Sequence, residues 1–359
     1  MSYLTTSTHL NNWIFTPDQL KQVARLKANK ARKQWAMCAA NPLLQRKPRS
    51  FACLLPATTN ATLDASDWND SLEEVDVGVV DDPSIFLTDH EEAMVVDFYQ
   101  VQVQNTCTTV FKTSDKVKAA AVLLFKRFYL SNSIMEFHPK YIGATCIYVA
   151  GKVEEQYISV ETLVKSYDGV VKESDVIAHE MIVLEGVRFQ LIMYHPFRSL
   201  TGFIDDLRAH SKSTRHTDVP ISTLQTLHAT ATAVINDLLL TDAPLLYPPA
   251  VVALAGLQVA TTVEMAIDWT KYLLACKRGQ GQSMHEVVQA IQEVVQLRAA
   301  READAAASEA ELKSAYKKLK GFYKSTPKKA AADESKEPKA KKHKSSDGKK
   351  SKKSKKGVA

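Results

Sequence analysis

The sequence of 359 residues has little of what most enzymes need. Its 12 glycines are dispersed, and no glycine-rich motif that cradles phosphate occurs. Its ten histidines never show the H-E-x-x-H spacing, and its five cysteines never form C-x-x-C. Phosphate-binding loops and clustered metal sites are therefore excluded at the level of sequence motifs. We expect no catalytic residue, no cofactor and no metal, and hence no enzyme.

Long apolar runs are also missing. No stretch approaches the roughly 18–20 apolar residues that a membrane span requires, and residues 1–12 contain no apolar segment of signal-peptide length. The odd, scattered cysteines fit reduced thiols better than disulfides. These absences predict an intracellular protein without a membrane partner.

The positive charge is concentrated at one end of the chain. Residues 327–359 contain 13 Lys and four acidic residues, a net charge of +9, which leaves 6 − 9 = −3 for the rest. A slightly acidic body argues against direct nucleic-acid binding by the folded part. The lysine clusters predict nuclear import, and hence location in the nucleus, through Lys341, Lys342, Lys344, Lys352, Lys353, Lys355 and Lys356.

Helical signals dominate the body, and no convincing strand pattern occurs, so the predicted fold class is all-α. Capping boxes at residues 16–19 and 88–91 open two helices, the first of them basic. Residues 117–130 and 174–187 read as further helices. Residues 141–151 are apolar or small almost all round, which predicts the central, buried helix of a bundle. The acidic segment 64–82 reads as a surface loop.

A single gapless shift aligns the second half of the body with the first. The shift places Leu238 on Phe128, Pro249 on Pro139 and Val252 on Ile142. In each half an apolar helix ends and an aromatic-x-Pro opens the buried helix, where proline is well tolerated. The pattern predicts two tandem helical repeats with extra terminal helices and a disordered basic tail. We divide the chain into five parts. An N-terminal helix with the acidic loop covers 1–83, the first repeat 84–192, the second repeat 193–300, a C-terminal helix 301–324 and the tail 325–359.

One charged pair stands out on the first repeat. Lys152 ends the buried helix, and Glu180 interrupts an apolar row formed by Val176, Val183 and Val187. The pair forms either an internal salt bridge or a binding site. The second repeat has Thr262 and Ala290 at the same register. Because that repeat is expected to fold without such a pair, its absence there favours a role in binding.

Three segments resemble the cyclin H family. They are FKRFYLSNSIMEFHP at residues 125–139, GKVEE at 151–155 and LTDAPLLYPP at 240–249. WIFT at 13–16 and the basic helix that follows are similar to that family's N-terminal helix. The resemblance covers roughly residues 10–300. Gly151 departs from the pattern, since Cys or Ser is more usual before the lysine.

The resemblance implies two cyclin boxes and a regulatory subunit that binds and activates a cyclin-dependent kinase of the CDK-activating type. It implies roles in transcription, within TFIIH, and in the cell cycle, with a RING-finger assembly subunit as a further partner. Lys152 and Glu180 match the family's kinase-contacting residues. Two alternatives remain: a cyclin C-like subunit of the Mediator kinase module, and a TFIIB-like nucleic-acid-binding factor.

Overall fold

The computed structural model describes residues 7–25, 27, 86–215, 219–261, 271–273, 284–307 and 309–325. These residues form helices joined by short connections, with no strand among them, so the prediction of an all-α fold is confirmed. None of the described helices has the length and apolar character needed to cross a membrane. By compactness the chain divides into residues 1–323 and 324–359. The acidic segment 64–82 and the lysine clusters of the tail lie outside the described residues.

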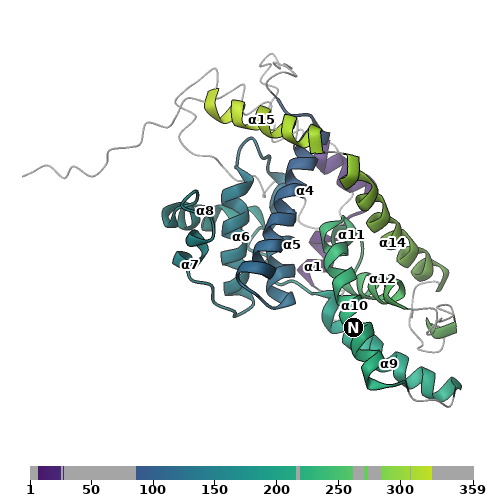
Figure 1. The fold of residues 1–359 in the computed structure, drawn as a ribbon. Coiled ribbons are helices and arrows are strands. Elements are labelled where there is room, and N and C mark those ends of the chain that lie inside the picture. Colours follow the sequence, from purple (N-terminus) through teal and green to yellow (C-terminus); the bar gives the residue numbers. More distant parts are fainter. Residues whose placement is uncertain are drawn as a thin grey trace, which may run out of the picture. The chain divides into compact units, whose positions relative to one another are not determined.

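The first repeat is built around α6 (Pro139–Val153), which packs against α4, α5, α7 and α8 (Figure 1). Its proline opens the helix, and most of its residues are buried, as the apolar pattern predicts. The other helices of this repeat are α4 (Asp89–Asn105), the π-helical turn η4 (Thr106–Val110), α5 (Asp115–Ser131), α7 (Val160–Lys165) and α8 (Glu173–Gly186).

The second repeat follows the same plan with α12 (Pro249–Ala260) in the place of α6. Its neighbours are α9 (Pro196–Arg215), α10 (Ile221–Leu240), the short α11 (Ala243–Leu246) and α14 (Met284–Ala307). The proposed register holds in the helix starts, because Pro139 of α6 and Pro249 of α12 are both the first helical residue. Ile142 and Val252 are both fully buried. The duplication seen in the sequence is therefore also a duplication of helices.

Polar side chains of the first repeat join it to the second. Gln100 Nε2 donates to the carbonyl of Leu240 at 2.7 Å, and Lys126 Nζ donates to the same oxygen at 3.2 Å. That carbonyl lies at the C-terminal end of α10, where backbone acceptors lack intrahelical partners. Both donor residues are buried. These two hydrogen bonds therefore join the repeats and also supply donors to a carbonyl at the end of α10.

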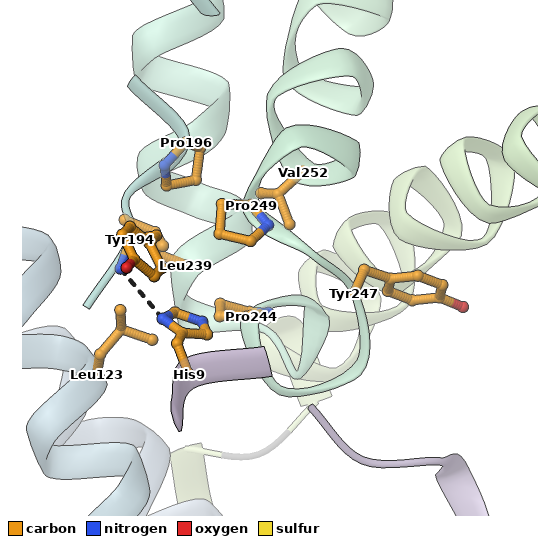
Figure 2. A pocket seen from close by; sticks show the side chains of 9 residues that line it. All are labelled: His9, Leu123, Tyr194, Pro196, Leu239, Pro244, Tyr247, Pro249 and Val252. Atoms are coloured by element: carbon orange, nitrogen blue, oxygen red, sulfur yellow. Dashed lines mark hydrogen bonds between the residues drawn. The ribbon is translucent and has the colours of Figure 1, made fainter. Parts of the chain in front are cut away.

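The short helix α1 (Thr8–Trp13) lies where the two repeats meet. Trp13 donates through Nε1 to Gln190 in the connection between the repeats at 2.7 Å, and the Arg127 guanidinium of α5 lies 4.7 Å from the Trp13 ring centroid. The backbone N–H of Phe15 donates to the carbonyl of Leu245 in α11 at 2.7 Å. Figure 2 shows His9 of α1 at a small pocket in this junction, accepting a hydrogen bond from the backbone N–H of Tyr194.

The C-terminal helix α15 (Glu309–Ser325) packs against the first repeat. The Tyr323 hydroxyl donates to the carbonyl of Ile134 at 2.6 Å, and Lys318 pairs with Glu91 at 2.6 Å. Glu92, the next residue of α4, is buried and pairs with Lys27 at 3.1 Å. The predicted capping box at residues 16–19 is present, and it opens helical residues 17–25. The first turn of α4 thus ties both terminal helices to the first repeat.

Candidate partner-binding site

The structure brings Lys152 and Glu180 together. Lys152 lies in the last turn of α6, where a cation interacts favourably with the helix dipole. Its Nζ donates to Oε1 of Glu180 on α8 at 2.7 Å. The two side chains keep 41% and 26% of their surface exposed. The pair is therefore an ion pair within the chain that also faces solvent, and both charges remain accessible to a partner.

The surroundings favour the charged form of Lys152. Partial burial lowers the pKa of this lysine, but the hydrogen bond to Glu180 and the contact with Tyr148 outweigh burial, so the net shift is upward. As an exposed pair it contributes only about 0–1 kcal/mol to stability. The interpretation as an internal salt bridge is correct as a description of the contact, but the contact is too weak to explain the pair by stability alone.

The apolar row that Glu180 interrupts is buried as expected. Val176, Val183 and Val187 are all fully buried, and α8 packs against α6. Glu180 sits at the edge of the row. Its position leaves the carboxylate partly exposed without breaking the packing of α8 on α6.

Two exposed apolar residues lie beside Glu180, and our sequence interpretation missed them. Ile177 is 59% exposed and Met181 is 55% exposed. They are four residues apart on α8 and therefore neighbours on the surface of the helix. A charged pair flanked by accessible apolar side chains suits a protein interface, because interfaces combine apolar contact with polar groups that set orientation. The i, i+4 spacing of Ile177 and Met181, on the flank of the valine row, is the signal that identifies this surface.

The buried polar residues of α5 were also missed. Lys126 and Arg127 lie within a largely apolar run, and both are almost completely buried. The helical pattern of α5 does not show that these two residues are buried, because their partners, Leu240 and Trp13, are far away in sequence. In the described part of the chain, no group of three or more His, Cys, Asp and Glu side chains is placed to hold a metal ion.

Comparison with known proteins assigns the chain to a family. Residues 93–192 match the cyclin N-terminal domain and residues 195–299 match the cyclin C-terminal domain. Cyclin-H1-1 of Arabidopsis thaliana is 34% identical over 276 residues, which cover 76% of this chain and 75% of the relative. The chain belongs to the cyclin H family. The match favours the cyclin H interpretation over the cyclin C-like and TFIIB-like alternatives.

Two solved complexes contain a chain with the same cyclin fold. One is the CAK complex of Chaetomium thermophilum bound to ATP-gamma-S: the TM-score is 0.66 at 22% identity, with 89% of this chain and 88% of that chain covered. The other is the yeast TFIIK (Kin28/Ccl1/Tfb3) complex: the TM-score is 0.54 at 22% identity, with 81% and 98% covered. At this identity the likeness establishes the fold, with both cyclin boxes.

Proposed function

We propose that this cyclin binds and activates a cyclin-dependent kinase of the CDK-activating type and acts in transcription, as part of TFIIH, and in cell-cycle control. The observation that carries the proposal is the partly exposed Lys152–Glu180 pair beside Ile177 and Met181. Membership of the cyclin H family and likeness to chains in the CAK and TFIIK complexes support it. On this proposal the chain regulates catalysis and contributes no catalytic group.

The mechanism follows from what a kinase requires. Phosphoryl transfer needs the ion pair between the β3 lysine and the αC glutamate of the kinase. A cyclin stabilises the state with that pair formed only by its differential affinity for it. A shift from 1:99 to 99:1 requires about 5.5 kcal/mol. One exposed ion pair cannot supply this free energy. A broad apolar surface of the first repeat, to which Ile177 and Met181 of α8 belong, must therefore contribute most of it, while Lys152 and Glu180 fix orientation.

Two finer proposals come from the family resemblance. We propose a RING-finger assembly subunit as a third component of the complex. We also propose location in the nucleus, supported by the lysine clusters between Lys341 and Lys356. Both follow from the assignment to a transcription-type cyclin.

The test is the double variant Lys152→Ala with Glu180→Ala. Removing both charges leaves no orphan charge, and alanine suits both helices, so the melting temperature should change little. Each lost charge-assisted contact to the kinase is worth about 1.5–3 kcal/mol, so affinity should fall roughly a hundredfold or more. Circular dichroism melts and a kinase assay titrated with the cyclin measure the two effects.

A matched control is Glu309→Ala with Lys313→Ala. This pair lies four residues apart within α15, has Nζ and Oε1 2.6 Å apart, and is more exposed. It should affect neither folding nor activation. A stable Lys152 and Glu180 double variant that activates at wild-type concentrations would refute the site. Early melting of that variant would instead identify the pair as structural.

A further inference from the structure

Lys152 is held from two sides. Glu180 of α8 accepts its hydrogen bond at 2.7 Å, and the aromatic ring of Tyr148 lies 4.2 Å from Nζ, measured to the ring centroid. Tyr148 and Lys152 are four residues apart on α6, so their side chains meet on one face of the helix. A cation within about 6 Å of a ring face is attracted by the ring quadrupole. Tyr148 therefore limits the positions that the ammonium group can take.

The second repeat lacks all three members of this arrangement. In the register that places Pro249 on Pro139, Tyr148 corresponds to Gln258, Lys152 to Thr262 and Glu180 to Ala290. The helix α12 nevertheless forms and is largely buried with Gln258 in it. The aromatic ring is therefore not needed to build this helix. The ring of Tyr148 occurs in the repeat that has a lysine at the end of its buried helix.

We infer that Tyr148 is a positioning residue of the kinase-binding site and that it orders the Lys152 side chain before the partner arrives. The inference rests on the proposed function and adds a residue to it. Glu180 alone fixes one direction of approach to the ammonium group. The ring of Tyr148 supplies a second constraint, and the two together hold the lysine near one rotamer.

The physical benefit is preorganisation. A free lysine samples many rotamers, and immobilising such a side chain at an interface costs about 0.5–1.5 kcal/mol, which corresponds to roughly 2- to 12-fold in affinity. A lysine already ordered in the free cyclin avoids most of this cost. Loss of the ring should therefore weaken kinase binding by about 3- to 10-fold through Lys152, without removing a contact to the kinase.

A simpler alternative is that Tyr148 only packs. The residue is partly buried against the core, so any truncation has some structural effect. Two substitutions separate the roles. Tyr148→Phe keeps an aromatic face under Lys152 and removes only the hydroxyl, which also interacts with the lysine, whereas Tyr148→Leu keeps an apolar side chain and removes both the face and the hydroxyl. If the ring acts on the lysine, phenylalanine rescues binding and leucine does not.

The experiment is a double-mutant cycle on the full chain, with the dissociation constant for the partner kinase as readout. In the wild-type background we expect Tyr148→Leu to weaken binding 3- to 10-fold and Tyr148→Phe to stay within 2-fold. In the Lys152→Ala background, Tyr148→Leu should have less than a 2-fold effect. An equal effect of leucine in both backgrounds, or none in either, would overturn the inference.

Nuclear magnetic resonance of the free cyclin gives a second readout. The ring should shift the Lys152 side-chain methylene signals upfield in wild type and in Tyr148→Phe, and the shift should vanish in Tyr148→Leu. Its persistence there would contradict the assigned contact.

The matched control for the affinity measurement is Lys140→Ala, because Lys140 Nζ lies 4.3 Å from the Tyr141 ring centroid at the other end of α6. That variant should leave kinase affinity unchanged.

A failure of the proposed function would give a different result from a failure of the positioning role of Tyr148. If Lys152→Ala itself leaves the affinity unchanged, the assignment of the kinase-binding site is wrong, and the role of Tyr148 there falls with it. If Lys152→Ala weakens binding but Tyr148→Leu does not, the site stands and the positioning role of Tyr148 is wrong.

Discussion

The imidazole of His138 caps α6 and contacts three aromatic rings. Its Nδ1 accepts the backbone N–H of Lys140 at 3.2 Å, and its ring lies 5.1 Å from that of Tyr323 on α15, with Tyr99 and Tyr141 at 5.9 Å. The capping role requires the neutral form, and a buried aromatic environment favours it. Burial, and after it the charge of Lys140, lowers the pKa of His138 to about 4.

This depressed pKa predicts acid sensitivity. An unfolded histidine titrates near pH 6.5, so the stabilisation is complete above that pH and is lost as the pH falls toward 4. Between pH 7.5 and 5 the wild type should lose about 2 kcal/mol more of its free energy of unfolding than His138→Asn, which can cap the helix but does not titrate. Urea denaturation at both pH values measures the difference. His9 titrates in both proteins and cancels, so equal losses would contradict the prediction.

At the scale of the elements, the contact between α8 and α5 depends on a missing side chain. A Cβ added to Gly186 would lie 2.4 Å from Cδ2 of Phe128, which is fully buried. Gly186→Ala should therefore destabilise the fold by about 1–3 kcal/mol through overpacking, although alanine is the better helix former.

The control for this substitution is Gly202→Ala on α9. Nothing lies within 4 Å of a Cβ added there, so alanine should stabilise by about 0.5–1 kcal/mol through helix propensity alone. Opposite signs for the two variants in thermal or urea unfolding are the expected outcome. A stabilising Gly186→Ala would mean that Phe128 and α8 can shift at little cost.

At the scale of the whole molecule, Trp13 links the first repeat to the connection that leads into the second. It is 1% exposed, lies against Arg127 of the first repeat and donates to Gln190 of the connection. Trp13→Ala should lower the free energy of unfolding by about 3–5 kcal/mol. Trp13→Phe keeps a ring under Arg127 but loses the donor to Gln190, which should cost about 1–3 kcal/mol. Denaturant unfolding of both variants tests the order, and an equal cost would show that the hydrogen bond, not the ring, dominates.

The predictable part of this molecule is local in sequence. The start of α6 at Pro139, the capping box at Thr88 and the register between the repeats follow from turn chemistry and apolar period, and the structure confirms them. The contact between Lys152 and Glu180 is one of the two interpretations that the sequence allows, because a carboxylate that interrupts an apolar row needs a partner.

The parts that escaped prediction depend on distant partners. Residues 8–13 are mostly polar and give no strong period, and α1 and the residues after it are stabilised by contacts with Arg127, Gln190 and Leu245. Gln100 and Lys126 are buried because a carbonyl of the other repeat needs donors. None of these features has a signal within its own stretch of sequence.

The hydrogen bond from Phe15 to Leu245 has a consequence for synthesis of the chain. Its donor lies before the first repeat and its acceptor lies inside the second, so most of the folded body separates them in sequence. At about 5–20 residues per second, a ribosome needs roughly 10–50 s to make the acceptor after the donor. The helix α1 is therefore made early and is among the last to find its place. Until Arg127 and Gln190 have been made, Trp13 has neither of its partners, and a chaperone that recognises aromatic side chains has time to bind it.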